Sequence, residues 1–318
     1  MSDNDPMWNT DLSLTLSSWN LIDSWKEHTG MKHLVLDIGD RMVRKHDTNP
    51  DFSLCQKGVW PGVESLSLST YQMEEGNAVE MGALVKDFAN LKNLQISYMD
   101  PTISVDDGEG FTSLAQSFQY TLYDSDDVLL PQAAQLTTLK LSAISLDASS
   151  LPDNLASIMP SLQVLSLDFL RNDFEEDEPV AESLLSLFEA LFPAALVCQS
   201  LRQISITCRL PYDEIIDDHS VECHDLLSIF TSKSVFPLLN EFEFNTEWGT
   251  SNIVFQPLAP WLRQINRRCL DDLQELMKDA SENLLVTYGY LPRFAGGDGM
   301  KLKCRGGEQA ESFTLAKL

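Results

Sequence analysis

The chain has 318 residues, of which 43% are hydrophobic, so it is long enough to bury a large core. It carries 48 acidic and 22 basic residues, and this formal net charge of −26 argues against nucleic acid or an anionic membrane as the main partner, because binding to phosphate groups requires positive charge on the protein. No apolar stretch reaches the roughly 18 residues that a membrane-spanning helix needs.

The first 30 residues contain two short periodic patterns. Three leucines alternate with polar residues as in a half-buried strand, namely Leu12, Leu14 and Leu16. Three large apolar residues then recur at helical spacing, namely Trp19, Ile22 and Trp25. We interpret residues 1–30 as an N-terminal partial repeat.

From residue 31 onward one pattern recurs seven times: an apolar residue is followed three and five positions later by two more. The copies are Met31-Leu34-Leu36, Val63-Leu66-Leu68, Leu91-Leu94-Ile96, Leu136-Leu139-Leu141, Leu162-Leu165-Leu167, Leu201-Ile204-Ile206 and Leu239-Phe242-Phe244. All intervening residues except Val35 and Val164 are non-apolar. The steps between copies range from 26 residues (136 to 162) to 45 residues (91 to 136).

Helix-type periodicity precedes several copies. Apolar residues spaced three and four apart predict short helices with one apolar face. These segments are residues 83–91, 151–159, 184–192 and 226–230. Pro160, Pro193 and Pro237 follow three of them and favour the change from helix to extended chain. Because a recurring helix-turn-strand unit cannot bury its apolar side alone, the sequence predicts an α/β solenoid over residues 31–255, with a parallel β-sheet on one face and helices on the other.

The C-terminal region continues the pattern of helix and strand up to residue 290, and the sequence after it has no such periodicity. Six apolar residues form a long helical stripe: Leu258, Leu262, Ile265, Cys269, Leu273 and Leu276. Together with the strand-like sequence NLLVTYGY at 283–290, they predict a capping helix and strand over residues 256–290. The run RFAGGDGMKLKCRGG follows, and we expect residues 291–318 to be a weakly ordered Gly-rich tail.

The seven copies share the form L-x-x-L-x-L, the strand half of a leucine-rich repeat. The sequences ANLKNLQISYMD at 89–100 and MPSLQVLSLDFL at 159–170 look most like it. Over residues 31–245 the chain resembles the irregular leucine-rich repeat proteins common in fungi, many of which begin with an F-box. The resemblance implies an irregular leucine-rich-repeat solenoid that binds a protein partner and has no enzymatic activity.

The chain departs from that family at two points. The regular repeat has Asn or Cys at position nine, where this chain has Gly39, Tyr71, Met99, Ile144, Leu170, Arg209 and Glu247. The first 30 residues have no opening Leu-Pro and no room for the three helices of an F-box. The resemblance therefore implies the substrate-recognition part of an F-box-type ubiquitin ligase whose F-box is absent or lies outside this sequence.

Side chains that alternate with the apolar triplets face the other side of the predicted sheet. We take this polar strip as the candidate partner-binding surface. Its candidate residues are Asn93, Gln95, Lys140, Ser166, Asp168, Gln203, Glu241, Glu243 and Asn245.

A second candidate is the acidic loop after the fifth copy, formed by Asp173, Glu175, Glu176, Asp177 and Glu178. Such a charge run is either a solvated loop or a docking site for a basic partner. It lacks the alternating D-x-D-x-D-G spacing of a calcium loop. This acidity leaves a second interpretation of the whole chain open, namely an acidic scaffold or inhibitor that clamps a basic protein and is unrelated to ubiquitin.

No catalytic, cofactor-binding or metal-binding motif is recognised in the sequence, so we expect no catalytic residues, no cofactor and no metal. His219, Cys223 and His224 supply too few ligands for a zinc site by themselves. The six cysteines show no C-x-x-C pairing, and without a signal peptide or an N-x-S/T sequon we expect reduced thiols and a cytoplasmic or nuclear location.

Overall fold

The structure is a computed structural model. It describes residues 12–16, 31–38, 60, 62–71, 85–86, 88–99, 113–124, 126–145, 155–169, 180–193, 196–210, 228–248, 277–278, 280–292, 300–306 and 314–317. The chain forms two compact units, which we describe separately. Unit 1 comprises Met1–Pro152 with Ser157–Leu162, and unit 2 comprises Asp153–Ala156 with Gln163–Leu318.

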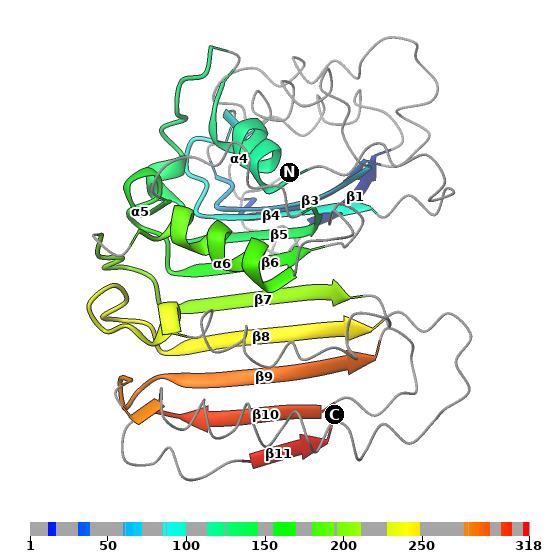
Figure 1. Ribbon diagram of the computed structural model, residues 1–318. Helices are drawn as coiled ribbons and strands as arrows, with labels where there is room; N and C mark the ends of the chain where they lie inside the picture. The colour runs from blue at the N-terminus through cyan, green and yellow to red at the C-terminus, as the bar shows by residue number, and fades with distance from the viewer. Residues whose placement is uncertain are drawn as a thin grey trace, which may run out of the picture. The chain divides into compact units, whose positions relative to one another are not determined.

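The described strands of unit 1 form a parallel sheet in chain order (Figure 1). They are β1 (Leu12–Leu16), β2 (His33–Ile38), β3 (Ser65–Tyr71), β4 (Asn93–Met99) and β5 (Thr138–Ile144). The central apolar residues of the copies are direct cross-strand partners, in the order Leu34, Leu66, Leu94 and Leu139. Leu12 pairs with Leu34, which confirms that the first leucine alternation is a strand of this sheet.

The described strands of unit 2 are also adjacent in chain order (Figure 1). They are β6 (Val164–Phe169), β7 (Gln203–Leu210), β8 (Glu241–Trp248), β9 (Leu285–Pro292), β10 (Met300–Arg305) and β11 (Thr314–Lys317). Strands β6 to β9 are parallel, with Leu165, Ile204, Phe242 and Val286 aligned across the sheet. Strands β10 and β11 add to it in antiparallel fashion.

The last two strands correct our expectation of a weakly ordered tail after residue 290. Met300, Leu302 and Cys304 alternate with lysines, which is the period of a half-buried strand. The surrounding glycines obscured this short pattern. Residues 293–299 are too few for the crossover that a parallel neighbour of β9 would need, so β10 returns antiparallel.

Helices occupy several of the connections, so the arrangement is of the α/β type. They are α4 (Leu114–Leu122), the 3-10 helix η4 (Ala133–Gln135), α5 (Leu155–Ile158) and α6 (Val180–Leu191), with further helical residues at 85–86, 228–231 and 277–278. α5, α6 and residues 228–231 confirm three of the predicted helical segments. The predicted helical stripe at 258–276 and the one at 19–25 lie outside the described residues.

Helix α4 was not predicted, although its start carries a clear local signal. The side-chain oxygen of Ser113 accepts from the Gln116 N–H at 3.1 Å, and the Gln116 side chain accepts from the Ser113 N–H at 2.9 Å. This reciprocal capping box satisfies two N–H groups at the helix start. The helix lies in the longest step between copies, 45 residues from 91 to 136, which accommodates it without shifting the strands.

Backbone hydrogen bonds fix the point where each strand begins. The carbonyl oxygen of Lys32 accepts from the N–H groups of Glu64 at 2.9 Å and Ser65 at 3.1 Å. The carbonyl groups of Glu64, Lys92, Gln163 and Arg202 accept in the same way from the next copy of their own unit. Each acceptor is the second residue of its motif, so the strand starts stay aligned while the connections vary in length.

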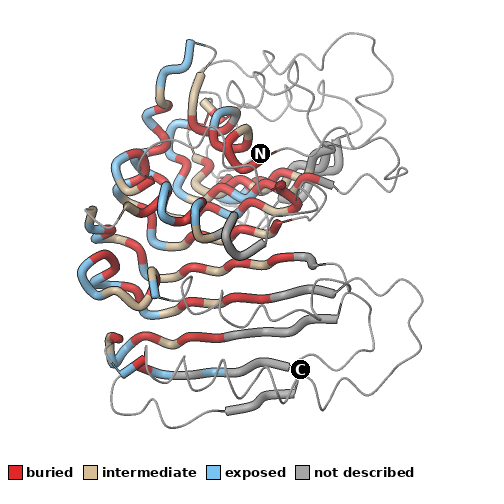
Figure 2. The backbone as a smooth tube through the Cα atoms, viewed as in Figure 1, coloured by how far each residue is buried: buried red, intermediate tan, exposed pale blue. Residues whose placement is uncertain are grey.

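The triplets form the core of each unit. Leu34, Leu66, Leu94 and Leu139 in unit 1 and Leu165, Ile204 and Phe242 in unit 2 are at most 2% exposed. Buried residues alternate with less buried ones along the strands (Figure 2). In unit 2, Phe230 stacks on Phe242 of β8 with ring centroids 4.5 Å apart and meets Phe188 of α6 edge to face. Helix α6 therefore packs on the sheet face opposite to the polar strip.

Candidate functional site

The polar strip of unit 1 forms a regular array on β3, β4 and β5. Its rows are set by strand register: Ser65, Asn93 and Thr138; Ser67, Gln95 and Lys140; Ser69, Ser97 and Ser142. Gln95 and Lys140 are exposed, and the other seven are partly exposed. Side chains of neighbouring strands are therefore displayed about 4.8 Å apart across the strands. Short hydroxyls and amides dominate this face, and Lys140 is its one charged residue within these rows.

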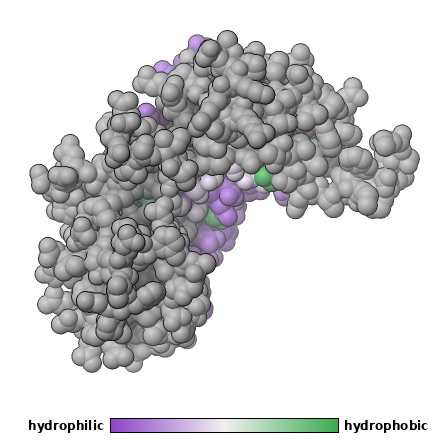
Figure 3. All heavy atoms as spheres, turned by 90° about the vertical axis from the view of Figure 1, so that its right-hand side faces the viewer, coloured by the Kyte–Doolittle hydropathy of each residue, from purple (hydrophilic) through white to green (hydrophobic). Residues whose placement is uncertain are grey.

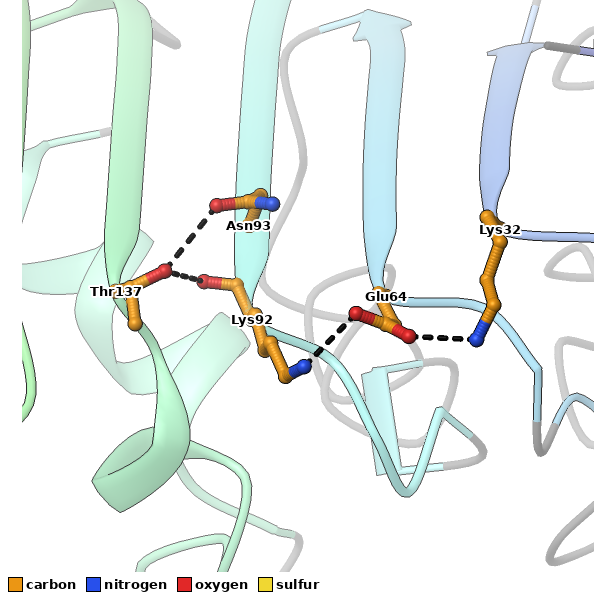
Figure 4. A network of polar contacts seen from close by, with 5 residues as sticks. All are labelled: Lys32, Glu64, Lys92, Asn93 and Thr137. Atoms are coloured by element: carbon orange, nitrogen blue, oxygen red, sulfur yellow. Dashed lines mark hydrogen bonds and ion pairs between the residues drawn. The ribbon is translucent and has the colours of Figure 1, made fainter.

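Beside this array lies a row of charged side chains, which we call the charged ladder. It is formed by the second residue of each of the first three copies, namely Lys32, Glu64 and Lys92 (Figure 4). Glu64 receives hydrogen bonds from Lys32 Nζ at 2.6 Å and from Lys92 Nζ at 2.8 Å. Further along the same edge, the Thr137 hydroxyl donates to the Lys92 carbonyl at 3.2 Å. The lysine side chains are about half exposed, so this edge presents positive charge on a chain that is acidic as a whole.

The two lysines stabilise the charged form of Glu64. Hydrogen bonds from Lys32 and Lys92 and their positive charges lower the pKa of Glu64 from 4.5 to about 2. A lowered folded-state pKa means that this contribution to stability is present above pH 4.5 and is lost as the pH falls toward 2. Because the group is solvent-exposed, we expect salt to weaken the effect.

We therefore expect the Glu64 carboxyl to titrate near pH 2 in the intact chain and to return toward 4.5 in the double variant Lys32→Met, Lys92→Met. The methionines keep the length of the side chains and remove their charge. Titration of the Glu64 side-chain carbon signal by NMR measures both midpoints. An intact-chain midpoint near 4.5 would show that the ladder does not persist in solution.

In unit 2 the strip runs across β6, β7 and β8. Its rows are Val164, Gln203 and Glu241; Ser166, Ser205 and Glu243; Asp168, Thr207 and Asn245. All but one of these residues are partly exposed. Charge is concentrated on Asp168, Glu241 and Glu243, so this face is more acidic than the array in unit 1.

Asn245 differs from the expectation of an exposed binding residue. It lies on the strip by register, but it is only 5% exposed, and within the described part of the chain its Oδ1 atom accepts no hydrogen bond. Thr287 of β9, which pairs with Glu243, is also buried at 4%. Strand alternation correctly gives the side of the sheet, but it does not give exposure, which depends on neighbouring strands that are distant in the sequence.

The structure thus groups the predicted site residues into two sets. Asn93, Gln95 and Lys140 lie together in unit 1, and the six from Ser166 to Asn245 lie together in unit 2. The described residues that reach the surface viewed in Figure 3 are mostly hydrophilic. The acidic loop of Asp173, Glu175, Glu176, Asp177 and Glu178 lies outside the described residues.

Another acidic segment is partly described, and one of its carboxylates has a structural role. Asp124 Oδ1 accepts from the N–H groups of Val128 and Asp126, each at 3.0 Å, and Lys86 Nζ donates to Oδ2 at 3.2 Å. The Val128 N–H, with smaller contributions from Asp126 and Lys86, holds the pKa of Asp124 below its ordinary value. Asp126 and Asp127 are exposed. The Asp124 carboxylate therefore stabilises the turn that leads from Asp124 to Val128.

The sequence reading missed several residues of these faces. Ser65, Ser67 and Ser69 of β3 complete the array in unit 1, and Lys303 and Arg305 of β10 extend the face of unit 2. The alternation along the strands that places the Gln95 side chain on the polar face also places the β3 serine side chains there. These serines were therefore predictable from the same pattern. The alternation of Met300-Lys-Leu-Lys-Cys was the available signal for β10.

Burial limits the reactivity of Cys198, and the described acidic groups do not form a metal-binding cluster. Cys198 is a buried free thiol, and burial raises its pKa to about 11, which keeps it protonated and unreactive at neutral pH; Cys208 is also buried. Among the residues that the structure describes, no group of three or more His, Cys, Asp or Glu side chains could hold a metal ion. None of the described helices is both long and apolar enough to cross a membrane.

No protein-family model matches the chain, and neither the curated proteins nor the solved structures provide a significant match.

Proposed function

We propose that the chain is an irregular leucine-rich-repeat protein without enzymatic activity that binds a protein partner through its strand faces. The observation that carries this proposal is the register of the copies: within each unit, equivalent residues of successive repeats stand side by side and display a regular array of mostly polar side chains. A surface assembled by repetition suits recognition of an extended partner surface. The resemblance to F-box and leucine-rich-repeat proteins favours the substrate-recognition part of a ubiquitin ligase.

A second candidate is an acidic scaffold or inhibitor that clamps a basic protein. Its support is the net charge of −26 together with Glu241 and Glu243 on the strand face of unit 2. Charge of this kind speeds association with a basic partner and makes it sensitive to salt. Purification of the full chain from native cells separates the two candidates: cullin-adaptor subunits among its partners support the ligase, and a single basic protein supports the clamp.

Arginine substitutions test whether the strand faces bind. We expect Gln95→Arg or Ser166→Arg to raise the off-rate of a purified native partner about tenfold or more, because a bulky charge in an interface mainly affects dissociation. The matched controls Gln135→Arg on η4 and Ser186→Arg on α6 place the same change at exposed helical positions of the same unit. Surface plasmon resonance measures the four rates. Equal off-rates in strand and helix variants would exclude the strand faces as the interface.

A further inference from the structure

The edge of unit 2 where its strands begin carries a row of hydrogen-bond donors around an arginine. The row consists of the second residues of three successive copies, namely Gln163, Arg202 and Asn240. The Arg202 N–H donates to the Gln163 carbonyl at 2.8 Å, and the Asn240 N–H donates to the Arg202 carbonyl at 2.9 Å. The three residues therefore lie side by side at the starts of β6, β7 and β8, and all three are exposed (Figure 2).

This row lacks the internal neutralisation of the equivalent row in unit 1. In unit 1 the second residues Lys32 and Lys92 donate to Glu64, which lies between them. In unit 2 the row has one positive charge and no carboxylate of its own. Within the described part of the chain, Arg202 takes part in no ion pair. A carboxylate from another molecule would supply the charge that Glu64 supplies in unit 1.

Two large apolar side chains are exposed beside the row. Val197 is 49% exposed and Leu238 is 46% exposed. Leu238 stands two residues before Asn240, so their Cα atoms are at most about 7 Å apart. The Cys198 N–H donates to the Val235 carbonyl at 2.7 Å, which brings the segment of Val197 beside the turn that contains Leu238. Apolar and charged groups therefore share this edge.

The combination is more informative than either part. Scattered apolar residues are common on protein surfaces and need no ligand. Among the residues that the structure describes, however, only Val128 of unit 1 adds to the exposed large apolar side chains. Protein interfaces are enriched in arginine and are most apolar at their centre. We call Gln163, Val197, Arg202, Leu238 and Asn240 the Arg202 edge.

The donor row determines the chemistry of the ligand. A guanidinium group presents N–H groups in a planar fork that binds both oxygens of a carboxylate, and side-chain amides beside it add further donors. The backbone N–H groups of Arg202 and Asn240 already donate to carbonyl groups, so they cannot form the backbone nest that captures a terminal carboxylate. The row therefore fits the side-chain carboxylate of Asp or Glu.

We infer that the Arg202 edge binds an extended segment of a partner protein in which an Asp or Glu residue stands two positions from an aliphatic residue. Side chains two positions apart lie on the same side of an extended segment, so the carboxylate pairs with Arg202 while the aliphatic side chain contacts Val197 and Leu238. This interface goes beyond the proposed function, because the second motif residues lie at the strand starts and not on the strand faces. It also takes an acidic segment, unlike the clamp for a basic protein.

Fluorescence anisotropy with the full chain and capped, labelled peptides tests the inference. The probe has Leu-Ser-Asp-Ser-Leu between Gly-Ser flanks, and two controls replace Asp by Asn or both Leu residues by Ala. We expect the Asp peptide to bind about threefold to fivefold more tightly than the Asn peptide, which is the factor that an exposed ion pair contributes. The Ala peptide should bind about tenfold more weakly than the probe, because it buries less apolar surface. Equal affinities of the Asp and Asn peptides overturn the inference.

Variants at exposed positions of the chain locate the binding. Arg202→Gln should make the Asp and Asn peptides bind equally. Val197→Ser with Leu238→Ser should weaken both peptides by a similar factor, about fivefold. Lys303→Gln is the matched control, because it removes one exposed positive charge from β10 of the same unit and should preserve the preference for Asp. A preference for Asp that survives Arg202→Gln contradicts the inference.

The strand-face variants separate this inference from the proposed function. Ser166→Arg should not weaken binding of the Asp peptide, and a loss of binding would place the peptide on the strand face and overturn the inference. A preference for Asp that depends on Arg202, with a native partner insensitive to Gln95→Arg and Ser166→Arg, would support the Arg202 edge and remove the proposed interface.

Discussion

Replacing Leu94 in unit 1 or Leu165 in unit 2 by alanine should lower the free energy of unfolding by about 2 to 5 kcal/mol, whereas Gln95→Ala and Ser166→Ala should change it by less than about 0.5 kcal/mol. Leu94 and Leu165 are at most 1% exposed, and their strand neighbours face the other side of the sheet. Deletion of a buried side chain loses its apolar contacts and leaves a cavity, and a surface truncation does neither.

Urea denaturation followed by circular dichroism measures the four variants. Each pair lies within one unit and differs by a single position, so the comparison tests the phase of the repeat. Similar losses at adjacent positions would show that the assignment of inner and outer faces is wrong.

Gly306→Ala should destabilise the C-terminal strands by about 1 to 3 kcal/mol. A Cβ atom at this position would overlap the carbonyl oxygen of Ser281 and lie 2.9 Å from its carbonyl carbon, so backbone has to move. The Gly306 N–H also donates to the Leu284 carbonyl at 2.9 Å, next to the start of β9. An alanine usually restricts the unfolded chain and gains about 0.4 to 1 kcal/mol, which is smaller than the expected cost of the overlap.

Hydrogen exchange measured by mass spectrometry should show faster exchange in residues 280–285 and 300–306 of this variant. Lys303→Ala is the control, because it removes an exposed side chain from the same strand and should leave the exchange unchanged. Slow exchange retained in Gly306→Ala would mean that the close approach to Ser281 is relieved without cost.

The division into two units affects how binding should be studied. Gln95 and Ser166 occupy equivalent positions of their copies, yet one belongs to unit 1 and the other to unit 2. The faces also differ in chemistry, since the array of unit 1 is rich in serine and the face of unit 2 carries both acidic and basic rows. Single substitutions in each unit are therefore more informative than a combined variant.

Several features of this protein were determined by the sequence alone. The triplet spacing places two apolar residues of each strand on the same side in every copy, and the alternation of side chains along a strand then fixes which residues face away. Leu34, Leu66 and Leu94 are aligned for this reason, as are Leu165, Ile204 and Phe242. The polar face that includes Gln95 and Ser166 follows from the same local periodicity.

Only the tertiary structure decided features that depend on residues far apart in the chain. Cross-strand pairing brought Lys303 and Arg305 to the face of Glu241 and Glu243, and it placed the second-position lysines of the first and third copies around Glu64. Burial of Asn245 and the close approach of Gly306 to Ser281 likewise arise from neighbours outside the local sequence. Periodicity encodes the direction of a side chain, but contacts between distant segments set its exposure and charge environment.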